Sequence, residues 1–251
     1  MTSTVTIGRR FVGPPDLANG GYACGLVAQA LTSGPAEVTL RHPPPVDRPL
    51  GVVLTPDQAA LYDGDRLIAE SRAAEPAVDL PAPVSFVDAE RAAEGFDEGQ
   101  YAARHHYPGC FGCGPGRDPG DGLRIFPAAA GPHRVVWPWI PDASLTGQGG
   151  LVEAALIWAA LDCTSGLAWY HDRPPASPHV LGRMTAAIHR RPEAGERLVA
   201  AGWAIGQQDR KRHSGSVIWA ADGEVLARNV ATWIVLDGRQ RAVFRPAGST
   251  D

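Results

Sequence analysis

Two acidic side chains, Glu153 and Asp162, stand in an otherwise apolar stretch from Thr146 to Tyr170, T-G-Q-G-G-L-V-E-A-A-L-I-W-A-A-L-D-C-T-S-G-L-A-W-Y. The composition predicts a helix that is apolar all round, and such a helix is buried. A buried acid is costly unless it is paired, hydrogen-bonded or protonated. Asp162 is therefore either a satisfied structural group or the reactive carboxylate of a site.

The spacing of the two acids excludes a carboxylate dyad. They are nine residues apart, and about 900° of rotation at roughly 100° per residue places them on opposite faces of a straight helix. Glu153 falls in the first turn, where an acid complements the helix dipole and can act as a cap. Asp162 lies mid-helix, where capping explains nothing. We therefore take Asp162 as the first-choice catalytic base and keep Glu153 as a second catalytic candidate.

An earlier stretch repeats this arrangement. Residues Leu17 to Leu31, L-A-N-G-G-Y-A-C-G-L-V-A-Q-A-L, again combine a Gly-Gly pair with a helix of small apolar residues, but no acid follows Gly20-Gly21. In the later copy, Gly149-Gly150 either opens the helix or belongs to the loop before it. Only the second of the two predicted central helices is charged.

Predicted antiparallel strands surround both helices, including Thr4 to Val12 and Leu123 to Phe126. Asp63-Gly64 and Asp222-Gly223 mark hairpin turns at corresponding places in the two halves. Repetition of this order over a long period indicates duplication. A sheet that wraps one buried helix needs its other side covered, and two such units packed side by side provide the cover.

The predicted fold is therefore α+β: a double hotdog of two tandem units, each an antiparallel sheet wrapped around a central apolar helix. We assign 1–75 to the first hotdog unit and 104–251 to the second. Residues 76–103, rich in Pro, Ala and acidic residues, form the expected linker, with a short helix near Ala89 to Glu94.

Composition narrows the function classes. A net charge of −4 and a pI near 6.1 argue against a general nucleic-acid binder. No charged-then-apolar signal segment opens the chain, and no apolar run reaches the length of about 18 residues that a membrane span needs. The expectation is a soluble, cytoplasmic protein without a membrane partner. Four cysteines do not make a disulfide framework in a chain of 251 residues.

Three motifs resemble hotdog acyl-CoA thioesterases. A-N-G-G-Y, Ala18 to Tyr22, resembles their helix start, where His-Gly-Gly is the usual form. C-F-G-C-G-P-G-R-D-P-G-D-G-L-R-I-F, Cys110 to Phe126, resembles a segment of phenylacetyl-CoA-thioesterase-like proteins. W-A-A-L-D-C, Trp158 to Cys163, resembles the helix of double-hotdog thioesterases whose aspartate activates water. The resemblance covers most of the chain outside the linker.

The resemblance implies hydrolysis of an acyl-CoA by general-base activation of water, or by direct attack of the carboxylate, at the thioester carbonyl. It places the carbonyl oxygen at the helix N-terminus near Gly20 and Gly21. The remaining candidate substrate-binding residues are Asn19, which is equally well read as a plain N-cap, His106 and Thr232. Thr232 resembles by its position on the last strand a polar residue that orients water; the alternative is an ordinary strand threonine without a chemical role.

The chain also departs from the family pattern. Asn19 and Gln148 stand where the motif has histidine, and Ala28 stands where an acid would follow Gly21. Asp162 comes twelve positions after Gly150, which is further than the usual seven or so. These departures keep open a non-catalytic protein that binds acyl-CoA or another acyl ligand. A hotdog dehydratase or hydratase is disfavoured because neither predicted helix supplies a histidine.

Two further clusters of polar residues could bind a ligand but also have ordinary structural explanations. Cys110 and Cys113 after His105-His106 have spacing compatible with zinc, but the second cysteine pair of a structural site is missing, so we expect no metal. The basic run Arg210 to His213 either steers coenzyme A phosphates or forms a solvated hairpin tip. No Walker, Rossmann, nucleophile-elbow or His-Glu-x-x-His motif is present, and no cofactor is expected. Hotdog units commonly associate, so a homo-oligomer is a further expectation.

Overall fold

A computed structural model describes residues 2–31, 34–147, 149–170 and 177–244. Its centre is one eleven-stranded antiparallel sheet with the strand order β1-β3-β4-β5-β2-β8-β11-β10-β9-β7-β6. The strands are β1 (Thr2–Thr6), β2 (Ala36–Leu40), β3 (Pro49–Leu54), β4 (Gln58–Asp63), β5 (Arg66–Ala73), β6 (Ala128–Ala129), β7 (Arg134–Trp139), β8 (His179–Ile188), β9 (Leu198–Gln208), β10 (Lys211–Ala220) and β11 (Val225–Val235).

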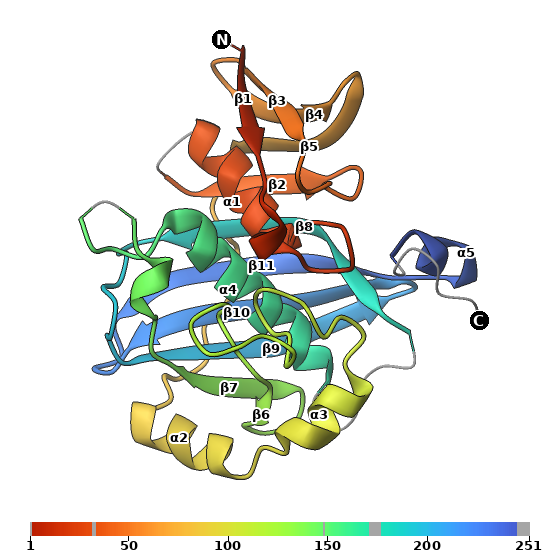
Figure 1. Cartoon of the computed structure of the whole chain (residues 1–251). Coiled ribbons are helices and arrows are strands. Elements are labelled where there is room, and N and C mark those ends of the chain that lie inside the picture. Colours follow the sequence, from red (N-terminus) through yellow and green to blue (C-terminus); the bar gives the residue numbers. More distant parts are fainter. Residues whose placement is uncertain (1, 32–33, 148, 171–176, 245–251) are drawn as a thin grey trace.

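Each half of the sheet has its own central helix (Figure 1). Helix α1 (Gly20–Leu31) packs on the strands of the first half, and α4 (Ala154–Leu167) packs on those of the second. The halves join where β2 pairs with β8, from Ala36 opposite Ala186 to Thr39 opposite Arg183. This pairing makes the two units one continuous sheet, and the α+β double-hotdog prediction is confirmed at the level of architecture.

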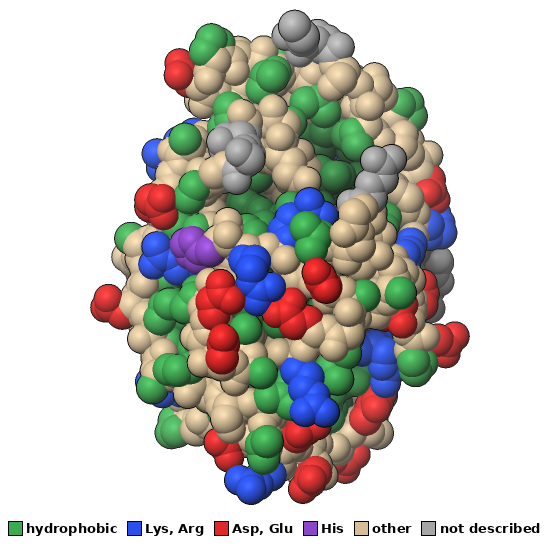
Figure 2. All heavy atoms as spheres, turned by 90° about the vertical axis from the view of Figure 1, so that its left-hand side faces the viewer, with side chains coloured by type: hydrophobic (Ala, Val, Ile, Leu, Met, Phe, Trp, Pro, Cys, Tyr) green, Lys and Arg blue, Asp and Glu red, His purple; other side chains and the backbone are tan. Residues whose placement is uncertain are grey.

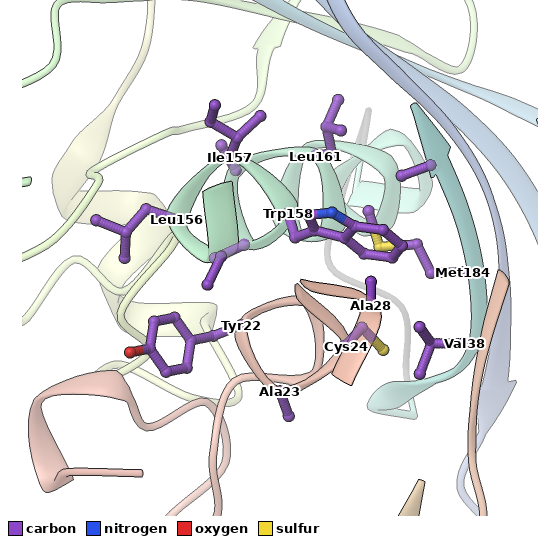
Figure 3. Packing of buried hydrophobic residues seen from close by; sticks show 14 of the residues in the cluster. Tyr22, Ala23, Cys24, Ala28, Val38, Leu156, Ile157, Trp158, Leu161 and Met184 are labelled. Carbon is purple, nitrogen blue, oxygen red and sulfur yellow. The ribbon is translucent and has the colours of Figure 1, made fainter. Parts of the chain in front are cut away.

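The two central helices cross at very short range (Figure 3). A Cβ atom added to Gly21 would lie 2.3 Å from Asp162 Cβ, and one added to Gly25 would lie 2.7 Å from Ala155 Cα. Every residue of α4 after Ala154 is buried, as the all-apolar sequence predicts. Glycines on α1 therefore let the backbone of one unit reach the acid of the other.

The segment between the units is more ordered than the linker prediction implies. Helix α2 (Phe86–Glu94), which covers the predicted short helix, buries Phe86 and Ala89 in a cluster with Trp219. Helix α3 (Glu98–Arg104) was not expected from the sequence, and its Tyr101 packs edge-on against Phe126. Both helices use aromatic side chains to cover parts of the second unit.

The chain after α3 runs back across the start of α1. Phe111 N–H donates to Val12 O at 2.7 Å, and its ring contacts Phe11 edge-on. Arg117 Nη2 donates to Arg10 O at 2.8 Å. These contacts hold the Cys110 to Cys113 segment over the junction of the two central helices.

The structure decides one boundary that the sequence left open and corrects two predicted strands. Gly149 and Gly150 have φ values of +88° and +73° and lie in the loop before α4, which begins at Ala154, so the second of the two alternatives holds. The expected strand Leu123 to Phe126 does not form, because Leu123 N–H donates to Phe111 O and not to a neighbouring strand. The expected strand Thr4 to Val12 ends at Thr6 and is followed by a 3₁₀ turn at Arg9–Phe11.

Surface charge and helix length agree with the composition. Acidic and basic side chains alternate on the face shown in Figure 2 and do not gather into a basic patch. Within the described ranges, no helix is both long and apolar enough to cross a membrane. The expected homo-oligomer stays a prediction.

Candidate active site

A cavity of about 370 Å³ opens between the N-terminal end of α1 and the C-terminal end of α4. Apolar side chains from both halves form most of its wall, among them Leu17, Leu40, Leu167, Leu181 and Trp233. Its polar lining includes Asn19, Asp162, two histidines and three cysteines: His105, His179, Cys110, Cys113 and Cys163. The cavity therefore depends on both units and on the way in which β2 and β8 join them.

Asp162 belongs to the wall of this cavity, and the residue is 2 % exposed. Oδ2 accepts a hydrogen bond of 2.8 Å from the Gly21 N–H of the facing helix. Oδ1 is buried and has no hydrogen-bond partner among the described residues. Burial raises the pKa of Asp162 to about 8, although the Gly21 hydrogen bond acts in the opposite direction. The buried group has one oxygen held and one oxygen available.

Counting from the helix starts aligns Asp162 with a position in the first half. Asp162 is the ninth residue of α4, and Ala28 is the ninth residue of α1. Measured from Gly150, Asp162 looked displaced from the family pattern, because that glycine lies four residues before the helix begins. The two halves therefore match in helix geometry and differ in chemistry at this position.

The first turn of α1 supplies backbone donors beside Asp162. Asn19 Oδ1 accepts from the Tyr22 N–H at 2.9 Å and caps the helix, while Asn19 O accepts from the Ala23 N–H. The Gly21 N–H is held by Asp162. Gly20 lines the cavity, and its N–H has no hydrogen-bond partner among the described residues. One helix-terminal donor thus remains open to a bound ligand.

Three predicted site residues lie elsewhere. Glu153 is exposed before α4, outside the cavity wall, and its side chain makes no cap hydrogen bond. Thr232 Oγ1 lies 3.2 Å from His213 Nδ1, outside the cavity. His106 is also absent from the cavity wall, which contains its neighbour His105 instead. The structure thus brings Asn19, Gly20, Gly21 and Asp162 together and leaves Glu153, Thr232 and His106 apart.

The site also contains a group of three thiols that was not expected from the sequence. The Sγ atoms of Cys110, Cys113 and Cys163 lie within 4.8 Å of one another, and all three residues line the cavity. Hydrogen bonds from the other two thiols lower the pKa of Cys110 well below its usual range. The Cys-x-x-Cys motif was a visible signal, but nothing in the sequence shows that Cys163 would face it.

His105 stands beside the thiols with a defined tautomer. Its Nδ1 accepts from the Tyr107 N–H at 3.0 Å, so in the neutral ring Nε2 holds the proton, and Nε2 lies 3.4 Å from Cys113 Sγ. Burial lowers the pKa of His105 to about 4. The neutral imidazole therefore donates toward the sulfur.

The basic hairpin is partnered. Arg210 Nη1 donates to Gln240 Oε1 at 2.5 Å and lies 3.3 Å from Asp237 Oδ2. Arg212 Nη1 lies 3.1 Å from His179 Nδ1, and its guanidinium stacks over the Trp169 ring. Arg210 is therefore held by the chain near Gln240, and Arg212 by His179 of the cavity wall, so neither arginine is fully solvated.

The buried side chain of His179, in the cavity wall, should make the stability of the protein depend on pH. Burial, with the Arg212 charge acting in the same direction, lowers its pKa to about 3 from an ordinary value of 6.5. Between those values the unfolded chain binds a proton that the folded chain does not, so the free energy of unfolding should fall on acidification from pH 6.5 by up to about 1.4 kcal/mol per pH unit. When the free energy of unfolding is measured with urea across this pH range, it should depend less steeply on pH in His179→Gln than in wild type. The same pH dependence in both proteins would contradict the lowered pKa of His179.

No family model matches the chain, and no curated protein matches it in sequence. Solved structures do match along nearly its whole length. The tesB protein of Mycobacterium avium subsp. paratuberculosis superposes with a TM-score of 0.63 at 12 % identity, covering 94 % of this chain and 93 % of that one. A hot dog fold protein of unknown function from Alicyclobacillus acidocaldarius gives 0.52 at 13 % identity, covering 94 % and 93 %. The chain is a double-hotdog protein.

A third structure, a putative thioesterase II from Thermobifida fusca YX, matches this double-hotdog protein with a TM-score of 0.55 at 16 % identity, covering 94 % of this chain and 92 % of that one. At these identities the similarity establishes the shared fold. The activity has to be argued from the residues around the cavity.

Proposed function

We propose that this double-hotdog protein hydrolyses an acyl-CoA thioester, with Asp162 as the general base. The observation that carries the proposal is the mainly apolar cavity whose wall includes both Asp162 and Gly20, the first residue of α1. An apolar chamber of this size suits an acyl chain. A carboxylate beside a helix N-terminus provides a base and an oxyanion donor for attack on a carbonyl.

The reaction follows from the two oxygens of Asp162. The Gly21 N–H holds Oδ2, and Oδ1 takes a proton from water while the water oxygen bonds to the thioester carbon. The carbonyl oxygen becomes an oxyanion and accepts from the Gly20 N–H. Collapse of this intermediate breaks the C–S bond, and the thiolate takes the proton back from Oδ1. The products are a carboxylic acid and free coenzyme A.

A non-catalytic acyl-binding protein is the second candidate, because Asp162 itself occupies the Gly21 N–H. The helix start then offers a ligand fewer donors than two adjacent free N–H groups would. A dehydratase or hydratase has less support, since neither α1 nor α4 contains a histidine.

The decisive experiment is free-thiol release from a panel of short, long and aromatic acyl-CoAs. The proposal predicts enzyme-dependent release that saturates with at least one substrate. Binding of acyl-CoAs in calorimetry without thiol release from any of them would reject hydrolysis in favour of the binding protein. If the protein neither binds nor hydrolyses any of these acyl-CoAs, both candidate functions are rejected for this panel of ligands.

A further inference from the structure

The three cavity thiols come from two distant parts of the chain. Cys110 and Cys113 lie in the loop after α3, and Cys163 follows Asp162 on α4. All three are buried, and no disulfide joins them. The fourth cysteine, Cys24, lies apart on α1 and is not a member of the group.

The spacing of the sulfurs fits a small tetrahedral ion. Zinc–thiolate bonds of about 2.3 Å place two sulfurs of a tetrahedron about 3.8 Å apart. Cys110 Sγ and Cys163 Sγ are 3.8 Å apart, and the three sulfurs lie within 4.8 Å of one another. Small side-chain movements would complete a three-thiolate set.

Glycines in the loop make this approach possible. A Cβ atom on Gly112 would lie 2.3 Å from Cys163 Sγ, and one on Gly114 would lie 2.4 Å from Pro108 O. The Cys-Phe-Gly-Cys-Gly sequence therefore folds tightly and brings its sulfurs against α4.

Hydrogen-bond donors surround the sulfurs. Asn19 Nδ2 lies 3.4 Å from Cys163 Sγ and 3.8 Å from Cys110 Sγ. His105 Nε2 donates to Cys113 Sγ. Thiols accept hydrogen bonds weakly, whereas metal-bound thiolates are commonly held by such outer donors. Because Nε2 holds the proton, His105 acts as an outer donor and not as a fourth ligand.

We propose that Cys110, Cys113 and Cys163 bind one Zn²⁺ ion as thiolates, with the fourth coordination position facing the cavity. Three protein ligands and one open position are the pattern of zinc sites that meet a substrate or water. The ion leaves one net negative charge on the cluster, which the Asn19 and His105 donors face. This site revises the expectation of no metal, and it does not depend on thioester hydrolysis.

Elemental analysis of the full chain, purified without chelator, tests the site. We expect about one zinc per chain, lost from Cys163→Ser and from Cys110→Ser. Cys24→Ser, a buried cysteine outside the group, is the matched control and should keep its zinc. Cobalt exchanged into the wild-type protein should give the thiolate charge-transfer and visible bands of tetrahedral ligation, which Cys163→Ser should lose.

Because a serine variant could misfold, the wild-type protein gives an independent measurement. Chelator should release zinc and make three additional thiols reactive. Wild-type protein that contains no zinc and does not take it up in equilibrium dialysis would overturn the proposal. A Cys110–Cys163 disulfide in freshly purified protein would do the same, and zinc retained by folded Cys163→Ser would refute the ligand set. Each result is independent of whether acyl-CoA is hydrolysed.

Discussion

Replacing Asp162 by asparagine should lower the rate of thiol release from a substrate acyl-CoA by about 10²- to 10⁴-fold, the usual contribution of a general base. The amide has the same shape and its oxygen can still accept from the Gly21 N–H, so the helix crossing should survive. It cannot take the proton of water. Steady-state thiol release and acyl-CoA binding, measured together, separate lost chemistry from lost affinity.

Glu153→Gln is the matched control for this experiment. It removes the other acid of the same segment, which is exposed and outside the cavity. Its rate should remain within about twofold of wild type, as expected for a surface change away from the site. If Asp162→Asn is as active as wild type, the assignment of the base is wrong, although the fold is unaffected.

Gly21→Ala should destabilise the protein by about 3 kcal/mol, near the upper end for overpacking a tight core. The new methyl group would lie 2.3 Å from Asp162 Cβ and 2.5 Å from Trp158 O. Backbone cannot move aside as a flexible side chain can, so α1 and α4 must separate. The midpoint of urea unfolding measures the loss, and thiol release should fall as well because the Gly21 N–H moves away from Asp162.

Gly51→Ala provides the comparison. Gly51 is also within a regular element, β3, but a Cβ atom there meets nothing within 4 Å. Its effect on the free energy of unfolding should be within about 0.5 kcal/mol. Equal stability of the two variants would show that the helices can separate without cost.

The double-hotdog architecture could be predicted from the sequence because the patterns that indicate it are periodic and occur twice. Two apolar helices with small residues, and Asp-Gly hairpins in the same order, indicate the duplication without any knowledge of tertiary contacts. The buried position of Asp162 followed from its apolar neighbours alone. The 370 Å³ cavity beside it was not predictable, because it depends on how the two halves join.

The open and wrong predictions have a common physical source. Gly149 and Gly150 matched the glycine pair of the first helix, and only their positive φ values show that they belong to a loop. His105 and His106 are adjacent in sequence, and only the backbone path after α3 decides which one reaches the cavity. The predicted role of Thr232 depended on which face of β11 its side chain occupies. A register shift between Thr232 and Trp233 changes the pairing of the strand at this point.

The thiols illustrate the same limit at longer range. Cys110 and Cys113 formed a recognisable motif, whereas Cys163 looked like an ordinary residue of a buried helix. Their meeting depends on glycine packing between the loop and α4. A local pattern therefore showed two members of the group, and only the folded chain shows the third.

The crossing of α1 and α4 also makes the two halves dependent on each other. Gly21 and Ala155 are the second residues of their helices, so a dimer built from two copies of the second half would set Ala155 against Asp162. Its methyl group would occupy the position where a Cβ on Gly21 comes within 2.3 Å of Asp162 Cβ. A single chain can place the acid in one half and the space for it in the other. Among the described residues the pair of helices therefore has one acid-facing site, where a symmetric dimer of identical units would have two.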